Sequence, residues 1–301
     1  MNLDVANDVF DLQNDGAFVK WKKQKLENYP KNINELRVTV NDGQSLSADE
    51  LEKIEANCRK ANMVLLDFKY PVEDKATVKR LGQQLGLHRL DGNLCADDDS
   101  ITSLTVMDTG RKNIYIPYSN KPISWHTDGY YNAADQQIRS VMLHCVSPAL
   151  TGGQNALVDH EIVYIHLRET NPDYIVALMQ QDVMIIPAND VEGETIRSGR
   201  SGPVFSVNPN DSKLHMRYTA RTRSIIWKDD LITGEAVACL KSFLDSDSPY
   251  IFHYRLEAGE NLLSNNILHT RTAFKDDEST SNEANKRLIY RARYLDRVAH
   301  T

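Results

Sequence analysis

The stretch SWHTDGYYN, residues 124–132, is the most informative part of this chain. It places His126 and Asp128 two residues apart, and on an extended strand the side chains at i and i+2 project from the same face. One imidazole and one carboxylate can therefore reach the same metal ion. A third donor must come from elsewhere, and His269 in NNILHTRTAF, residues 265–274, is the candidate.

This donor set suits Fe(II), because two imidazoles and one carboxylate occupy one face of an octahedral ion and leave the other positions for substrates and oxygen. The set therefore indicates oxygen chemistry. The same side chains also bind Zn(II). A zinc hydrolase on a β-barrel, and a ligand-binding protein without catalysis on the same fold, are the alternatives.

A second cluster lies near the C-terminus, where KRLIYRARYLD, residues 286–296, is typical of a strand. Alternation places Arg287, Ile289, Arg291 and Arg293 on one face of that strand. A buried guanidinium needs an anionic partner, because an unpaired buried charge is costly and its fork suits a carboxylate. The pattern favours an anionic ligand, with structural salt bridges as the alternative.

The composition limits the class of protein. The chain has 301 residues, of which 41% are hydrophobic, enough for one elaborate domain. We expect residues 1–47 to form an N-terminal extension packed on the core and residues 48–301 to form a single domain. The net charge of -7 argues against nucleic acid and favours a small-molecule partner.

Four single cysteines without a CxxC pair indicate reduced thiols and a cytoplasmic protein. The acidic start and the lack of a long apolar run predict no signal peptide and no membrane contact. A homo-oligomer is only the general expectation for such proteins.

Periodicity predicts the local structure. Residues 47–61 and 73–86 are typical of helices on either side of a buried strand at 62–68. Later helices are expected at 160–181, with a break near Pro172, and at 234–246. The remaining apolar runs alternate as strands do. Strands outnumber helices, which predicts a mainly β core with surrounding helices.

The order of these motifs resembles the taurine dioxygenase family (TauD/TfdA type), over roughly residues 47–296. The resemblance is carried by the LLDF strand between its two helices, by WHTD, TGGQN and ILH, and by R-x-x-x-R. HTDGYYN, GGQNALVD and GENLLSNNILHTR are also similar to the γ-butyrobetaine hydroxylase branch. The family consists of Fe(II)- and 2-oxoglutarate-dependent oxygenases. Its fold is a double-stranded β-helix, a cupin-like jelly roll with iron between two sheets.

The resemblance implies a role for each matching residue. His126, Asp128 and His269 match the iron ligands, and Arg287 matches the arginine that holds the distal carboxylate of 2-oxoglutarate. Asn155 falls where the taurine enzymes have a threonine that helps to bind that carboxylate and the butyrobetaine branch has asparagine.

The substrate is expected to be a small anion, such as a carboxylate, a sulfonate or a betaine-like molecule. Arg291 matches the arginine that clamps the sulfonate of taurine. Tyr130 and Tyr131 flank the metal motif and could line the substrate pocket, although aromatic packing in the core is the alternative. His144 alternates with apolar residues and is expected to be a core residue. The polar insert around residues 275–285 has no predicted role.

The implied reaction couples oxidative decarboxylation of 2-oxoglutarate by O2 to attack on a C–H bond, releasing succinate and CO2. Halogenating relatives replace the carboxylate ligand with a small residue, and this chain keeps Asp128, so hydroxylation is favoured. The sequence leaves open the identity of the substrate, and also desaturation or C–N or C–S cleavage as the final outcome.

Overall fold

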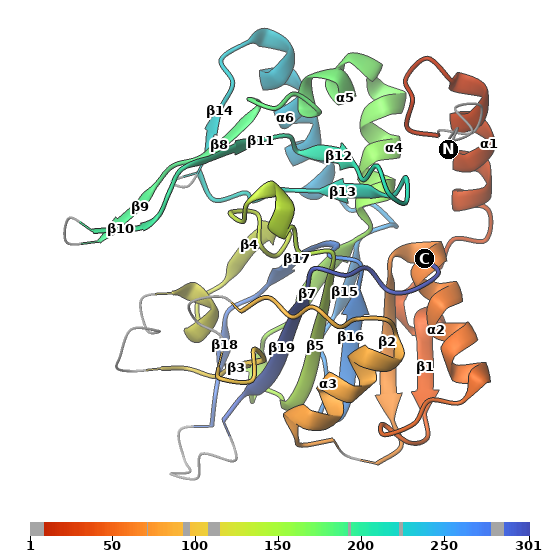
Figure 1. Ribbon diagram of the computed structural model, residues 1–301, viewed down its shortest axis with the longest axis vertical. Coiled ribbons are helices and arrows are strands. Elements are labelled where there is room, and N and C mark those ends of the chain that lie inside the picture. The colour runs from red at the N-terminus through yellow and green to blue at the C-terminus, as the bar shows by residue number, and fades with distance from the viewer. Residues whose placement is uncertain are drawn as a thin grey trace.

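The computed structural model describes residues 9–70, 72–92, 97–107, 115–191, 194–222, 225–277 and 286–301. Two facing sheets form the centre of this described part (Figure 1). The large sheet has the order β1 (Arg37–Val40), β2 (Met63–Phe68), β16 (Glu260–Ser264), β5 (Ser140–Ser147), β19 (Leu288–Tyr294) and β3 (Thr102–Leu104). The small sheet has the order β15 (Phe252–Tyr254), β7 (Asn155–Val158), β17 (Leu268–Arg271) and β4 (Ile123–His126).

The main core lies between these two sheets. Neighbouring strands pair antiparallel, apart from the parallel pair β1–β2. Leu65 and Leu262 of the large sheet belong to one buried cluster with Leu157 and Leu268 of the small sheet. Burial of apolar side chains on both inner faces holds the sheets together. The predicted mainly β, double-stranded β-helix fold is confirmed.

Two helices cover the outer face of the large sheet. They are α2 (Ala48–Ala61) and α3 (Lys75–Gln84), and the cluster beneath them takes the alternate strand residues, such as Val64, Leu66 and Leu263. Helix α2 begins with a capping box in which the Ser47 and Glu50 side chains bind each other's backbone N–H groups. Both helices were predicted from the periodicity of the sequence.

The remaining helices pack at the other end of the molecule (Figure 1). They are α1 (Asp15–Leu26), α4 (His160–Thr170), α5 (Pro172–Leu178) and α6 (Leu231–Leu244). The expected break near Pro172 separates α4 from α5. Helix α1 was not predicted. Its Lys25 is buried, and Nζ lies 2.7 Å from Asp159 and 2.5 Å from Glu161 at the start of α4. Strand β1, which also lies within the first 47 residues, joins the large sheet by pairing with β2.

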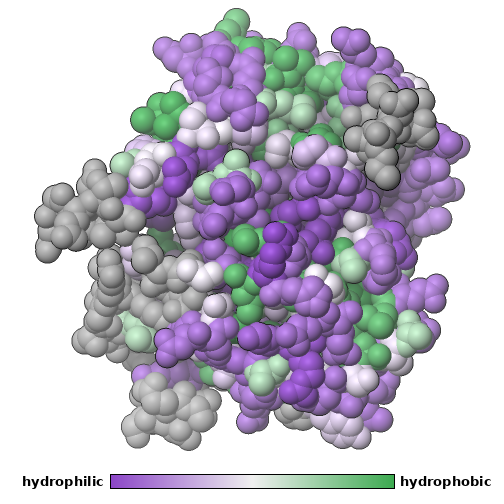
Figure 2. All heavy atoms as spheres, in the orientation of Figure 1, coloured by the Kyte–Doolittle hydropathy of each residue, from purple (hydrophilic) through white to green (hydrophobic). Residues whose placement is uncertain are grey.

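Short strands complete the described fold. They pair as β8 (Met184–Ile186) with β11 (Arg200–Gly202) and β14 (Ile226–Trp227), β9 (Asn189–Val191) with β10 (Glu194–Arg197), β12 (Phe205–Val207) with β13 (Leu214–Met216), and β6 (Thr151–Gly152) with β18 (Phe274–Lys275). The β9–β10 hairpin projects away from the body as an arm (Figure 1). Most of the face in Figure 2 is hydrophilic. No helix in the described ranges is long and apolar enough to span a membrane.

Candidate active site

The two predicted histidine ligands meet on the last two strands of the small sheet, β17 and the edge strand β4. His126, the last residue of β4, and His269, on β17, are direct cross-strand partners. Their ring centroids lie 4.3 Å apart, with an angle of 47° between the ring planes. The pairing of two strands thus brings together side chains that are remote in sequence.

Both imidazoles present the same nitrogen to the site. His126 Nδ1 lies 2.9 Å from the carbonyl oxygen of Ser124, and His269 Nδ1 lies 3.1 Å from that of Ile267. A carbonyl oxygen only accepts, so each Nδ1 carries the proton. Each Nε2 therefore has a free lone pair, which is the form of histidine that binds a metal.

Asp128 lies in the turn that follows β4 and is 5% exposed. Its Oδ1 accepts a hydrogen bond from Arg291 Nη1 at 3.3 Å, and Arg293 Nη1 lies 3.9 Å from the same oxygen. Its Oδ2 is buried and has no hydrogen-bond partner among the residues that the structure describes. A buried carboxylate oxygen without a donor is costly, so Oδ2 is suited to a cation.

The protonation states agree with a cation site. Burial, together with the neighbouring His269, lowers the pKa of His126 to about 3, which keeps it neutral. Burial disfavours a charged Asp128, but Arg291 and Arg293 outweigh it and hold the pKa of that carboxyl well below its usual range. Across the described ranges, no three His, Cys, Asp or Glu side chains are grouped closely enough to hold a metal. In this arrangement the Asp128 carboxylate pairs with Arg291 and does not join His126 and His269.

A cavity opens beside the two histidines, between the sheets. Its lining includes His126, Asn155, His269, Arg271, Arg287 and Arg291. Burial, with the nearby charges of Arg287 and Arg291, lowers the pKa of Arg271 to about 9. The concentration of guanidinium groups gives the cavity a positive electrostatic potential, which favours anions over cations.

Arg287 is the clearest candidate for binding that anion. It is 8% exposed, and no salt bridge joins its guanidinium to an acidic side chain in the described part of the chain. Its Nη1 is buried and finds no hydrogen-bond partner in the described part of the chain, and its guanidinium carbon lies 4.9 Å from the centre of the Phe274 ring. Burial lowers the pKa of Arg287 to about 10, so the side chain stays charged at neutral pH.

Asn155 lies at the start of β7 and also lines the cavity. Its Nδ2 donates to the carbonyl oxygen of Thr270 at 2.6 Å. An amide NH2 group has two hydrogens, so the second remains for a ligand. Asn155 and Arg287 therefore border the same space.

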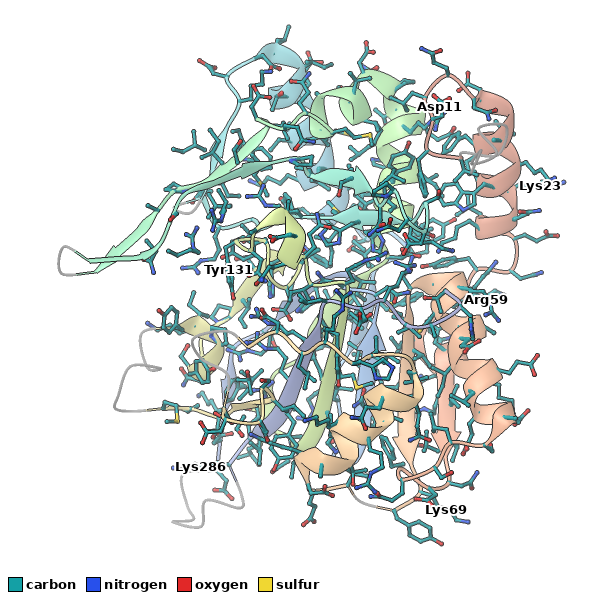
Figure 3. All side chains as sticks on the ribbon, in the orientation of Figure 1. Asp11, Lys23, Arg59, Lys69, Tyr131 and Lys286 are labelled. Atoms are coloured by element: carbon teal, nitrogen blue, oxygen red, sulfur yellow. The ribbon has the colours of Figure 1, made fainter. Side chains whose placement is uncertain are left out.

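The three candidates for substrate binding lie at different places. Arg291 lines the cavity, and its buried Nε has no hydrogen-bond partner within the described residues. Tyr130 and Tyr131 do not line this cavity. Tyr131, labelled in Figure 3, accepts a hydrogen bond from Arg293 Nη1 at 2.9 Å, and its ring lies 5.9 Å from the guanidinium carbon of Arg197 at the foot of the arm. Tyr130 packs edge-on against it, with ring centroids 5.1 Å apart.

The roles of two neighbours of the site, Arg271 and Asn266, were not predicted from the sequence. Arg271 donates to the carbonyl oxygens of Pro117, Ser119 and Lys121 and fixes the segment that borders the cavity. Asn266 binds the backbone of Asp128. Both lie in the stretch around His269, but nothing in the spacing of residues indicates contacts so remote in sequence. His144, as expected, is a core residue that binds the carbonyl oxygen of Val72.

Comparison with known proteins finds a matching family and several similar proteins. Residues 25–293 match the model of the taurine catabolism dioxygenase TauD, TfdA family. A uridine-5'-phosphate dioxygenase from Amycolatopsis sp is 29% identical over 184 residues, which are 57% of this chain and 60% of that protein. Another, from Streptomyces sp, is 27% identical over 193 residues, or 61% of this chain and 67% of that protein. The match thus spans only about two thirds of these relatives.

Among solved structures, asparagine oxygenase in complex with Fe(II), 2S,3S-3-hydroxyasparagine and succinate is similar in fold. The TM-score is 0.57 at 13% sequence identity, and the superposition covers 86% of this chain and 93% of that one. A non-heme iron oxygenase, OrfP, in complex with Fe and alpha-ketoglutaric acid has a TM-score of 0.58 at 13% identity, with 82% and 78% of the chains covered.

Proposed function

The chain belongs to the taurine catabolism dioxygenase TauD, TfdA family, and we propose that it is an Fe(II)- and 2-oxoglutarate-dependent dioxygenase. It would hydroxylate a small, anionic organic substrate and release succinate and CO2. The observation that carries this proposal is the pairing of His126 with His269 beside a cavity lined by Arg287, whose guanidinium forms no salt bridge within the described residues.

The residue types around the two imidazoles suit a ferrous ion, and ligation by all three would require the Asp128 carboxylate to turn from Arg291 towards the imidazoles. His126 and His269 would bind the ion through Nε2, and Asp128 through Oδ2, for which the described ranges provide no hydrogen-bond donor. When bound, such an ion supplies the activation of dioxygen that the decarboxylation of 2-oxoglutarate requires. The backbone carbonyls that accept from each Nδ1 hold the rings in the orientation that this ligation needs.

The cavity fits 2-oxoglutarate as co-substrate. Arg287 would pair with its distal carboxylate in a charge-assisted, bidentate contact, and the second amide hydrogen of Asn155 would support the same group. The face of Phe274 keeps water from one side of the Arg287 guanidinium and limits its rotation. This placement, rather than acid–base chemistry by the protein, is the contribution of these side chains.

The primary substrate would carry a negative charge. Arg291 lines the cavity, its Nη1 holds Asp128, and its Nε has no hydrogen-bond partner in the part of the chain that the structure describes, so Arg291 would bind an anion beside the metal ligands. Tyr130 and Tyr131 would border the substrate from the side of the arm. The relatives from Amycolatopsis and Streptomyces are named for uridine 5'-phosphate, which makes nucleoside monophosphates the first class to test, ahead of carboxylates, sulfonates and betaines.

Release of succinate tests the proposal. The protein with Fe(II), O2 and 2-oxoglutarate is incubated with nucleoside monophosphates, small carboxylates, sulfonates and betaines, and succinate is measured. We expect at least one anionic compound to stimulate succinate release above the uncoupled rate. A zinc hydrolase or a protein without catalysis would form no succinate under any of these conditions.

A further inference from the structure

We propose that Asn266 is the positioning residue that fixes Asp128 relative to the two imidazoles; this inference rests on the proposed function. Asn266 lies in the bend between β16 and β17, three residues before His269. Its side chain is 2% exposed, and its backbone adopts the left-handed region, with φ of 52°. Asparagine tolerates this region better than other residues with a Cβ.

The Asn266 amide binds the Asp128 backbone at both ends. The Asp128 N–H donates to Asn266 Oδ1 at 2.8 Å, and Asn266 Nδ2 donates to the carbonyl oxygen of Asp128 at 3.0 Å. The other Nδ2 hydrogen goes to the carbonyl oxygen of Ile138 at 2.6 Å. One hydrogen bond would leave the residue free to rotate, whereas a reciprocal pair fixes both the position and the tilt of its backbone.

Asp128 needs this support because strand pairing ends before it. His126 is held by its partner His269 at the end of β4, whereas Asp128 lies in the following turn. In that turn Gly129 has φ of 67°, and a Cβ there would lie 2.4 Å from the Ile138 side chain. Asn266 links this turn and Ile138 to the segment that leads directly into His269. It therefore connects two candidate ligands that come from distant parts of the chain.

The neighbouring Asn265 provides a matched control. It is also buried, at 3% exposed, and its Nδ2 donates to Asn62 Oδ1 and to Thr301 Oγ1, each at 3.1 Å. Its Oδ1 accepts from Val298 N–H at 3.3 Å. These contacts hold the C-terminal segment and touch none of the candidate metal ligands. Both asparagines thus support the fold, but only Asn266 reaches Asp128.

The test compares Mn(II) affinity, measured by electron paramagnetic resonance, in the full chain and its variants. Asn266→Gly keeps the left-handed backbone accessible and removes all three hydrogen bonds. Asn266→Asp keeps the Oδ1 acceptor and loses both donors. Asn265→Ala is the control. Each variant is measured under conditions in which circular dichroism shows that it is folded.

We expect Asn266→Gly to weaken Mn(II) binding by about 10- to 100-fold, the usual effect of removing a residue that orients a metal ligand. Asn266→Asp should also bind Mn(II) more weakly than the wild type, because its second carboxylate oxygen would face the carbonyl oxygens of Asp128 and Ile138. Asn265→Ala should bind Mn(II) like the wild type despite a lower Tm. Wild-type affinity in folded Asn266→Gly would overturn the inference, as would an equal loss in Asn265→Ala. If the wild type itself failed to bind Mn(II), the proposed function would fall as well.

Discussion

His126 and His269 lie directly opposite each other on β4 and β17, with their rings 4.3 Å apart between centroids and each Nδ1 bound to a backbone carbonyl. The register of one strand pair therefore determines both the distance between the imidazoles and the nitrogen that each presents. A shift of this register by one residue would send one of the rings to the other face of the sheet.

The first prediction concerns these two rings. His126→Ala or His269→Ala should abolish measurable Mn(II) binding, because each removes one of three proposed donors. His144→Ala is the control, since His144 is also buried but binds only the carbonyl oxygen of Val72. Isothermal titration should show normal Mn(II) affinity for the control. A separate thermal melt should show that the control has a lower Tm than the wild type. Unchanged binding in either variant would contradict the assignment.

The second prediction concerns Arg287. Arg287→Met should weaken 2-oxoglutarate binding by about 100-fold, since one charge-assisted bidentate contact contributes roughly 2–3 kcal/mol. Without ligand, Arg287→Met should be about as stable as the wild type, because the buried guanidinium forms no salt bridge within the described residues and only the weaker attraction of Asp276 is lost.

Arg255→Met is the matched control for that comparison. Arg255 lines the same cavity but is already paired with Glu257, with Nη2 3.1 Å from Oε1. Its loss should leave 2-oxoglutarate affinity close to that of the wild type. Differential scanning fluorimetry with and without 2-oxoglutarate measures both quantities, and equal losses in the two variants would rule out a specific role for Arg287.

The third prediction concerns the substrate. Arg291→Met should raise KM for the anionic substrate by tenfold or more, roughly the effect of one lost charge-assisted hydrogen bond. Succinate release is assayed at saturating Fe(II), because Arg291 also binds Asp128. An unchanged KM would show that Arg291 serves Asp128 alone.

The fourth prediction concerns pH. Burial opposes ionisation of Glu50, but hydrogen bonds from Asn41 and Ser47 lower its pKa from 4.5 to about 2. A lowered pKa in the folded state means that this stabilisation is complete above about pH 4.5 and is lost as the pH falls towards 2. Glu50→Gln should be less stable at pH 7 and lose less stability on acidification. Glu52→Gln, on the exposed side of the same helix, should follow the wild type in urea denaturation.

Much of the fold could be predicted from the sequence because local rules determined it. The capping box at Ser47 and the proline at residue 172 mark helix ends, and alternation along residues 288–294 separates the cavity face of β19 from the helix face. Helix α1 escaped prediction because its anchor is Lys25, a charged residue whose acidic partners on α4 lie far away in sequence.

The candidate site, like the fold, has some residues that the sequence predicts and others that it does not. The residue types at His126, Asp128 and His269 indicated a metal, since their chemistry is local. The contacts of Asn266 and Arg271 could not be predicted, because each depends on which backbone atoms the fold brings opposite them. The pairing of Arg291 with Asp128 could not be predicted either. The sequence pattern around an arginine on a barrel strand is the same whether the side chain binds a substrate or a carboxylate of the protein.

The most direct test of the central claim is anaerobic addition of 2-oxoglutarate to the protein loaded with Fe(II), followed by visible absorption. We predict a weak charge-transfer band that saturates with one 2-oxoglutarate per chain and is absent from His126→Ala. If the wild-type protein binds Fe(II) and 2-oxoglutarate without developing this band, the two ligands do not meet at one site, and the account is wrong.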